Sequence, residues 1–329
     1  MVNVAINGFG RIGRLVLRAG LEDKNINFVA INDLSDLKTM AYLFKYDSVH
    51  DQFKGKVDVK GGFLVINNKK IKFFSEKEPA KLPWKKLNVD VVFESTGRFK
   101  TENDLQNHIK AGAKKVLLSA PAKEGNITTV VMGVNDKDAK GRKFVSNASC
   151  TTNSLAPLLK VIDEKFGIER GFITTVHSYT SSQNILDLPH KDLRRGRAAA
   201  INIIPTTTGA AKAVGMVIPS LKGKIDGMAI RVPTPDGSYS DATLILKKEM
   251  SENKINNVVK EAAKKELKGI LEYSEEELVS SDIVGNPHSS IFDSKQTRVK
   301  GNLVKLGAWY DNEWGFSKRM IDVVKLMAR

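Results

Sequence analysis

The chain has 329 residues, of which 41% are apolar, and its 52 lysines and arginines outnumber its 37 aspartates and glutamates. This length suits about two domains with a large core, and the apolar content is too high for a disordered protein. The net charge of +15 is compatible with nucleic acid, an anionic membrane surface or phosphorylated substrates. The sole cysteine, Cys150, excludes an internal disulfide and a cysteine-rich zinc site.

The sequence also does not have the features expected of a membrane protein. No apolar run approaches the roughly 20 residues of a membrane span, and the N-terminal residues lack the basic start and long apolar middle of a signal peptide. A single cysteine is typical of a reducing compartment. We therefore expect a cytoplasmic protein without a membrane partner, and no metal site is predicted.

The first 150 residues alternate short apolar runs with longer amphipathic ones, which predicts parallel strands joined by helices. Strands are expected over 2–7, 27–32, 64–66, 70–74, 90–94, 115–119, 130–133 and 143–147, and helices over 11–21, 36–46 and 104–111. The lysine-rich stretch 54–78 is expected to form a hairpin inserted on this sheet.

Beyond residue 150 the pattern changes to a long helix followed by a largely antiparallel sheet. Helices are expected over 151–166, 252–267 and 316–327, with Gly167 as the C-cap of the first, and strands over 171–178, 224–232, 238–247 and 303–310. The expected fold class is α/β. A Rossmann-type dinucleotide-binding domain over 1–149, completed by a C-terminal helix over 313–329, precedes an α+β catalytic domain over 150–312 with a mainly antiparallel sheet.

A glycine-rich turn opens the chain, with G-x-G-x-x-G at Gly8, Gly10 and Gly13 between an expected strand and an expected helix. Such glycines allow close approach of the backbone to a pyrophosphate, which the helix N-terminus attracts. Asp33 ends the second strand, where a carboxylate accepts hydrogen bonds from a ribose. The pattern predicts a dinucleotide site, with a purely structural turn as the alternative. Asp33 favours NAD over NADP, although Lys77 weakens that preference.

Cys150 stands where a β-like run meets the expected long helix, between Ser149 and Thr151. A thiolate at a helix N-terminus is stabilised by the helix dipole and by free N–H groups. A lone cysteine is by default a small buried apolar residue. The polar surroundings and the helix start favour a nucleophile here.

A nucleophilic cysteine requires a base, and the chain offers five histidines. His177 ends an apolar strand and precedes residues with hydroxyl groups, which favours it as the base. The alternative is a structural histidine at a strand end. We expect His108, on the face of a helix, to be solvated. His50 and His288 lie in polar loops, and His190 lies in a basic loop.

Basic loops supply candidate anion sites in the second half of the chain. The run 191–197 is rich in lysine and arginine, Thr206–Gly209 offers hydroxyl and N–H groups, and Arg231 ends a strand. Each of these is also compatible with a solvated surface. Two anion sites near one thiol suit a phosphorylated substrate and a second phosphate.

Seven motifs together resemble the phosphorylating glyceraldehyde-3-phosphate dehydrogenase family from end to end. They are NGFGRIGR at 7–14, SNASCTTN at 146–153, HSYT at 177–180, DLPHKDLRR at 187–195, PTTTGAAKA at 205–213, RVPTP at 231–235 and WYDNEWGFS at 309–317. The resemblance implies an NAD-dependent enzyme of glycolysis or gluconeogenesis. Such an enzyme converts D-glyceraldehyde 3-phosphate and inorganic phosphate to 1,3-bisphosphoglycerate through a cysteine thioester. It also implies a homotetramer whose interface includes residues 179–200.

The resemblance further assigns the site residues, with Cys150 as the nucleophile and His177 as its base. The residues expected to bind NAD are Asn7, Gly8, Gly10, Arg11, Ile12, Gly13, Asp33, Lys77, Thr96, Gly97, Ser119 and Asn312. The substrate phosphate is expected at Thr180 and Arg231. The attacking phosphate is expected at Ser149, Thr151, Arg197, Thr208 and Gly209.

One segment departs from the family pattern, because residues 181–184 read SSQN where many members carry Asn-Asp-Gln-Arg. The change removes a charge pair from the expected interface loop. An erythrose-4-phosphate dehydrogenase is the nearest alternative, which Thr208 and Arg197 disfavour. A nucleic-acid-binding protein would require basic faces with interleaved aromatic residues. Only 7% of the residues are aromatic, so we expect no primary nucleic-acid role.

Overall fold

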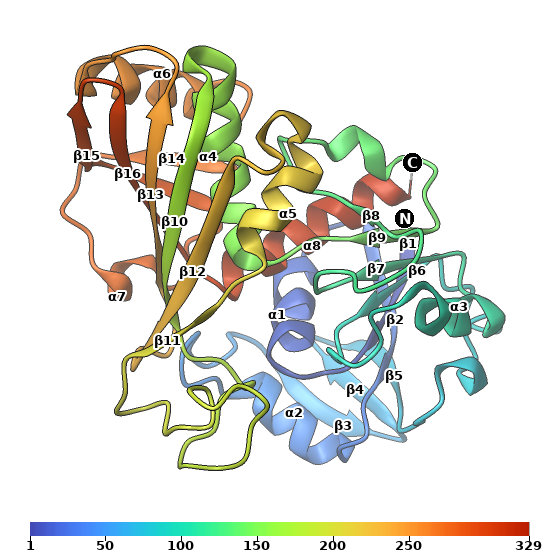
Figure 1. Cartoon of the computed structure of the whole chain (residues 1–329). Coiled ribbons are helices and arrows are strands. Elements are labelled where there is room, and N and C mark those ends of the chain that lie inside the picture. Colours follow the sequence, from blue (N-terminus) through green and yellow to red (C-terminus); the bar gives the residue numbers. More distant parts are fainter. Residues whose placement is uncertain (329) are drawn as a thin grey trace. The chain divides into compact units, whose positions relative to one another are not determined.

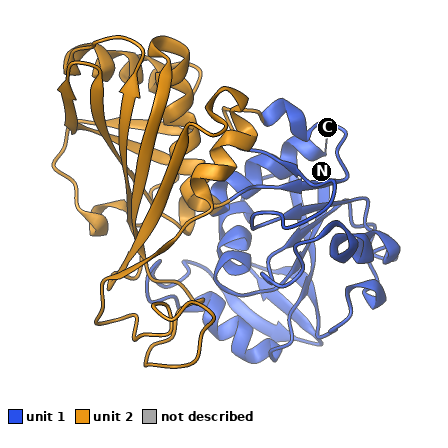
Figure 2. Cartoon of the chain, in the orientation of Figure 1, with its two compact units in different colours: residues 1–130, 136–148, 317–329 blue, residues 131–135, 149–316 orange. Residues whose placement is uncertain are grey.

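A computed structural model describes residues 1–328. The chain forms two compact units (Figure 2), the first comprising residues 1–130, 136–148 and 317–329 and the second residues 131–135 and 149–316. In the described part of the chain, no helix has both the length and the apolar character needed to cross a membrane.

Within the described residues, unit 1 is built on a nine-stranded sheet in the order β3-β4-β5-β2-β1-β6-β7-β9-β8 (Figure 1). The strands are β1 (Val2–Asn7), β2 (Ile26–Asn32), β3 (Val57–Lys60), β4 (Phe63–Ile66), β5 (Lys69–Phe74), β6 (Val91–Glu94), β7 (Lys115–Leu118), β8 (Thr128–Thr129) and β9 (Phe144–Ser146). The strands from β5 to β8 in this order pair in parallel, whereas β3, β4 and β5 pair antiparallel. The lysine-rich stretch therefore forms the antiparallel edge of the sheet.

The central strand β1 lies between β2 and β6. The chain thus continues from β1 to one side of the sheet and later returns to the other side. In open parallel sheets, ligands bind beyond the carboxyl ends of the strands at such a reversal of strand order. The topology places a binding crevice beside Asn7, Asn32 and Glu94, which end these three strands.

Four helices accompany this sheet: α1 (Arg11–Gly20), α2 (Leu37–Lys45), α3 (Glu102–Lys110) and the C-terminal α8 (Trp314–Met327). The last helix packs against the end of α1, because a Cβ at Gly20 would approach Ile321 to 2.6 Å. An ion pair of 3.0 Å joins Lys325 to Asp23 just beyond α1.

The strand predicted over 130–133 is wrong. The strand in this region is β8, which ends at Thr129, and the chain then turns at Gly133 with a φ of +78°. Val130 and Val131 are fully buried, and a Cβ at Gly133 would lie 2.6 Å from Leu267. The apolar run thus fills a packed turn, which an apolar pattern alone does not distinguish from a short strand.

Unit 2 contains, in its described residues, a seven-stranded sheet in the order β11-β12-β10-β13-β16-β15-β14. The strands are β10 (Ile168–Ser178), β11 (Ile204–Thr207), β12 (Ile225–Val232), β13 (Ser238–Leu246), β14 (Leu271–Ser274), β15 (Ser290–Lys300) and β16 (Leu303–Tyr310). Only the pairs β10–β12 and β14–β15 are parallel among these strands. The predicted combination of a Rossmann-type domain with a mainly antiparallel α+β domain is confirmed.

The long helix α4 (Cys150–Phe166) packs against the sheet of unit 2, and both α5 (Ala210–Val217) and α6 (Glu252–Lys264) pack against α4. Gly167 ends α4 with a φ of +70°, and its N–H donates to the carbonyl of Asp163. The remaining helical elements are short: α7 (Ser280–Ile283), η1 (Pro79–Lys81), η2 (Asp136–Ala139) and η3 (Pro219–Leu221).

Candidate active site

The cysteine begins α4, as its sequence context predicts. Ser149 is the N-cap, and its Oγ accepts a hydrogen bond of 3.0 Å from the N–H of Thr152. The preceding residue, Ala148, is fully buried and has a φ of +55°. This turn starts the helix abruptly at Cys150, so that the thiol lies where the positive end of the helix dipole favours a thiolate.

His177 meets this thiol from the end of β10. Its Nε2 lies 3.4 Å from Cys150 Sγ, and its Nδ1 lies 2.7 Å from the carbonyl oxygen of Ser178. The parallel register of β10 and β12 pairs His177 with Arg231. Arg231 Nη1 consequently lies 3.1 Å from His177 Nδ1 and donates to Ser178 O at 2.9 Å.

Burial and positive charge determine the protonation of this pair. Burial, followed by the charges of Arg231 and Arg195, lowers the pKa of His177 from 6.5 to about 3. Burial raises the pKa of the Cys150 thiol, and Arg231 opposes that rise. His177 is therefore neutral at pH 7, which leaves it able to accept a proton from the thiol.

Tyr310 of β16 connects the elements that carry the two groups. Its hydroxyl hydrogen-bonds to Thr151 at 2.9 Å and to Thr175 at 2.8 Å, and its ring packs edge-on against His177 with 5.9 Å between centroids. Burial raises the pKa of Tyr310 above its usual value. The hydroxyl of Thr151, predicted to bind phosphate, is engaged by Tyr310 in this structure.

The other residues predicted to bind anions lie on several elements of unit 2. Thr180 hydrogen-bonds to Ser182 at 2.9 Å, just past β10. Gly209 is the N-cap of α5, and Thr208 Oγ1 accepts from the N–H of Ala210 at 3.2 Å. Arg197 is exposed and pairs with Asp187 at 3.0 Å.

Arg195 is a functional candidate that the sequence did not single out. Its Nε donates to Thr206 at 2.9 Å, and its charge lowers the pKa of both His177 and Arg231. Three arginines occur over 194–197, but the sequence alone does not show which of them brings its charge close enough to affect the histidine. Asn312 is buried, and its Oδ1 accepts from Ser238 at 2.6 Å.

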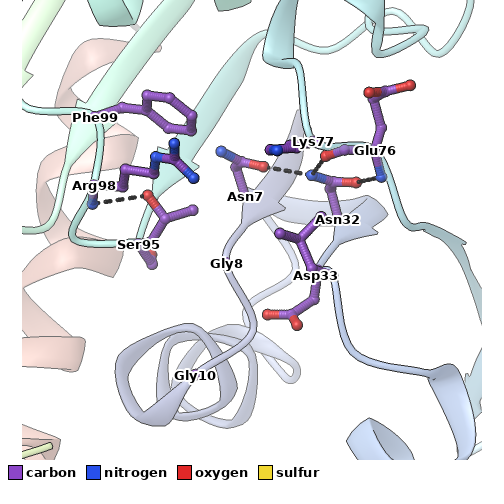
Figure 3. Close-up of a pocket in the computed structure, with 12 residues that line it drawn as sticks. Asn7, Gly8, Gly10, Asn32, Asp33, Glu76, Lys77, Ser95, Arg98 and Phe99 are labelled. Carbon is purple, nitrogen blue, oxygen red and sulfur yellow. Dashed lines mark hydrogen bonds between the residues drawn. The ribbon is translucent and has the colours of Figure 1, made fainter.

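Unit 1 carries a cavity of about 310 Å³ at the predicted crevice (Figure 3). Six residues of the predicted cofactor set line it: Asn7, Gly8, Gly10, Asp33, Lys77 and Thr96. Six further lining residues were missed: Asn32, Leu34, Glu76, Ser95, Arg98 and Phe99. Most of these residues follow β2, β5 and β6. They could have been predicted from the parallel topology, because ligands bind beyond the carboxyl ends of such strands.

The other six residues of the predicted cofactor set lie outside this lining: Arg11, Ile12, Gly13, Gly97, Ser119 and Asn312. Arg11 pairs with Asp47 at 2.7 Å. Burial would raise the pKa of Asp47, but hydrogen bonds from Val49 N, His50 N and Arg11 lower it to about 2. Ser119 donates to the carbonyl of Glu94 at 3.0 Å.

The glycine turn fits a dinucleotide. A Cβ at Gly13 would lie 2.1 Å from Gly8 O, and one at Gly8 would lie 2.6 Å from Thr96 N, so both positions require glycine. A Cβ at Gly10, the N-cap of α1, would meet only open space. A pyrophosphate can therefore reach the first N–H groups of α1. Asp33 stands beside this turn and accepts from Phe9 N at 2.7 Å.

Comparison with known proteins agrees with this geometry. The family model described as "Glyceraldehyde 3-phosphate dehydrogenase, NAD binding domain" matches residues 2–102, and the C-terminal domain model of the same family matches residues 149–312. The chain belongs to the glyceraldehyde-3-phosphate dehydrogenase family. The predicted resemblance is thereby confirmed.

Full-length relatives from several bacteria carry the name glyceraldehyde-3-phosphate dehydrogenase. The chain is 57% identical to the relative from Thermotoga maritima, with 100% of both chains covered. It is 56% identical to the relative from Geobacillus stearothermophilus and 55% to that from Priestia megaterium, covering 99% of this chain and 98% of each relative. The chain is thus an NAD-dependent dehydrogenase of this family, and the erythrose-4-phosphate alternative is not favoured.

Proposed function

We propose that this chain oxidises glyceraldehyde 3-phosphate on Cys150 and transfers the acyl group to inorganic phosphate. The observation that carries the proposal is the 3.4 Å approach of His177 Nε2 to Cys150 Sγ at the start of α4. A thiol, a neutral imidazole and a helix N-terminus together form an activated nucleophile. A cysteine with a purely structural role does not require a neutral imidazole and a helix N-terminus beside its thiol.

The base role requires a particular tautomer of His177. A lone pair on Nε2 can accept the thiol proton only if the other ring proton resides on Nδ1. We assign that proton to the hydrogen bond with the Ser178 carbonyl, 2.7 Å from Nδ1. Arg231 Nη1, which lies 3.1 Å from Nδ1 and can only donate, then directs its hydrogens away from the ring. Arg231 donates to the same carbonyl and holds positive charge beside the thiolate as it forms.

The chemistry then follows from the groups present. The thiolate attacks the aldehyde carbon, and the carbonyl oxygen, now negative, lies near the free N–H groups at the start of α4. NAD, when bound, supplies the hydride acceptor. The protonated His177 first returns the thiol proton to the substrate oxygen, which gives a hydroxyl group. His177 then takes that proton back as the C–H bond breaks, which leaves a thioester on Cys150. Phosphate attacks the thioester and departs as an acyl phosphate, and the thiolate is restored.

Two anions must be held near the thiol in this scheme. We assign the substrate phosphate to Thr180 and Arg231. The attacking phosphate is assigned to Ser149, Thr151, Arg197, Thr208 and Gly209. The start of α5 supports the second assignment, since Thr208 and Gly209 precede its first N–H groups. We add Arg195 to this site, because its Nη2 donates to the carbonyl of Thr207, the neighbour of Thr208, at 3.1 Å.

A homotetramer is proposed on the basis of one exposed apolar segment. Six large apolar side chains between residues 185 and 203 are 59–86% exposed: Ile185, Leu186, Leu188, Leu193, Ile201 and Ile203. Single exposed apolar residues are ordinary, but a concentration of this kind marks an interaction surface.

We also place the enzyme in the cytoplasm, since a thiol nucleophile acts only when reduced.

Initial rates of NADH formation test the substrate and the phosphate step together. The expected result is rapid turnover with glyceraldehyde 3-phosphate that depends on inorganic phosphate, and slower turnover with erythrose 4-phosphate. Cys150→Ser should abolish turnover and leave NAD binding nearly intact. Phosphate-independent turnover on erythrose 4-phosphate alone would overturn the proposal.

A further inference from the structure

The sequence predicts a solvated His108 on the face of a helix, and this prediction is wrong. His108 is completely buried in unit 1. The indole Nε1 of Trp84 can only donate a hydrogen bond, and it lies 3.1 Å from His108 Nδ1. Nδ1 is therefore the acceptor, and the ring proton resides on Nε2. That proton points at Glu94 Oε2, 3.0 Å away. Trp84 thus fixes the tautomer with which His108 donates to Glu94.

Glu94 ends β6, is fully buried, and receives hydrogen bonds on both carboxylate oxygens. Oε2 accepts from His108 and, at 2.6 Å, from Asn7 Nδ2. Oε1 accepts from the N–H of Thr96 at 2.9 Å and from the Thr96 hydroxyl. All four partners donate, so an ionised carboxylate is the group that satisfies them together.

The hydrogen bonds continue from Asn7 to the far wall of the dinucleotide cavity. Asn32 Nδ2 donates to Asn7 Oδ1 at 2.7 Å, and Asn32 exchanges two hydrogen bonds of 2.8 and 2.9 Å with the backbone of Glu76. Figure 3 shows Asn7, Asn32 and Glu76 following one another in this order around the cavity. One continuous network therefore runs from Trp84 through Glu94 to Glu76.

The network joins the three walls of the cavity. Asn7 ends β1, Asn32 ends β2, Thr96 lies in the segment after β6, and Glu76 lies in the segment after β5. We propose that Glu94 is a positioning residue for NAD binding, which acts through Asn7 and Thr96 and does not itself line the cavity. His108 and Trp84 support it by fixing the direction of the buried donor.

A purely structural role for Glu94 makes a different prediction. A buried carboxylate that only stabilises the core would, when altered, lower the melting temperature and leave the affinity of the folded protein for NAD unchanged. A positioning role predicts that the affinity for NAD falls while turnover at saturating NAD is retained. Because the reacting groups Cys150 and His177 belong to unit 2, kcat reports on chemistry that the network does not touch.

The test replaces Glu94 by Gln, which keeps the size and turns an acceptor into an amide donor facing other donors. We expect the Kd for NAD, measured by titration calorimetry, and the KM for NAD to rise about tenfold, with kcat and the KM for aldehyde within about twofold of wild type. Asp293→Asn is the matched control. Asp293 is 3% exposed and accepts from Trp309 Nε1 and Lys295 N, both at 3.2 Å, but lies outside the cavity lining.

The control should lose thermal stability and keep its Kd for NAD. An unchanged Kd in Glu94→Gln would overturn the proposal. If that variant does not fold, His108 provides the test. His108→Leu removes the donor and should raise the Kd for NAD, whereas His108→Gln retains an N–H group and should restore most of the affinity. Equal Kd values for these two variants and wild type would also overturn the proposal.

Discussion

Arg231 is the cation that Cys150 and His177 share. Its position follows from strand register, since β12 places it directly beside His177. Burial raises the pKa of the thiol, and this positive charge opposes that rise, which favours the thiolate. Burial lowers the pKa of His177, and the same charge lowers it further, which keeps the imidazole neutral. One side chain therefore adjusts both members of the pair in the direction that nucleophilic attack requires.

Removal of this charge should be visible in the reactivity of the thiol. In Arg231→Gln the pKa of Cys150 rises, because burial then acts unopposed by Arg231. Alkylation by iodoacetamide, which consumes the thiolate, should slow severalfold at pH 7, and its pH profile should move to higher pH. Arg170→Gln, an exposed change at the opposite end of β10, is the control and should leave the profile unchanged. A profile unaffected by Arg231→Gln would contradict the role assigned to this cation.

The turn before α4 is the element on which the active site depends most. Ala148 has a φ of +55°, a conformation that residues other than glycine, asparagine and aspartate rarely adopt. It is followed at once by the N-cap Ser149 and by Cys150. Backbone held in such a conformation costs about 1–3 kcal/mol and is concentrated at functional sites.

A branched side chain at this turn should therefore be costly. Ala148→Val should destabilise the fold by about 1–3 kcal/mol, because valine tolerates positive φ poorly and the site is fully buried. It should also lower kcat by moving Cys150 away from His177. Ala148→Gly relieves the backbone and should retain kcat. The contrary finding, equal kcat and melting temperature in Ala148→Val and wild type, would mean that the turn does not position the thiol.

Elements and motifs differed in how far the sequence could predict them. The sequence around the helix from Cys150 to Phe166 contained signals for both of its ends, in the polar N-cap Ser149 and the glycine C-cap Gly167. The sequence contained no signal for the burial of His108. That burial depends on Trp84 and Glu94, which are distant in the sequence and contact His108 only in the folded domain. The choice between Arg195 and Arg197 likewise depends on the path of a loop that has no regular period.

At the scale of the whole molecule, the excess of positive charge is unevenly distributed. Residues 54–86 contain ten lysines against Asp58, Glu76 and Glu78. Many of these lysines are exposed on the antiparallel edge of unit 1, where Lys72 lies 4.4 Å from the centroid of the Phe63 ring. Together with Arg231, whose charge acts on the thiol, and Arg195, whose charge acts on His177, this excess attracts anionic substrates and cofactors.

The attraction predicts a dependence on ionic strength. The kcat/KM for glyceraldehyde 3-phosphate should fall about threefold as salt rises from about 0.01 to 0.2 M, because screening shortens the reach of the positive charge. Alkylation of Cys150 by iodoacetamide, which is uncharged, should change little over the same range. Equal salt dependence for the charged and uncharged reagents would exclude electrostatic attraction as the cause.

The acyl group on Cys150 is the central claim and can be observed directly. The enzyme is mixed with NAD and glyceraldehyde 3-phosphate in the absence of inorganic phosphate, quenched in acid and digested for mass spectrometry. We predict one phosphoglyceroyl group on the peptide that contains Cys150, formed together with one NADH per subunit, and its loss when phosphate is added. Continuous NADH formation without phosphate, or an acyl group on any other residue, would contradict the account.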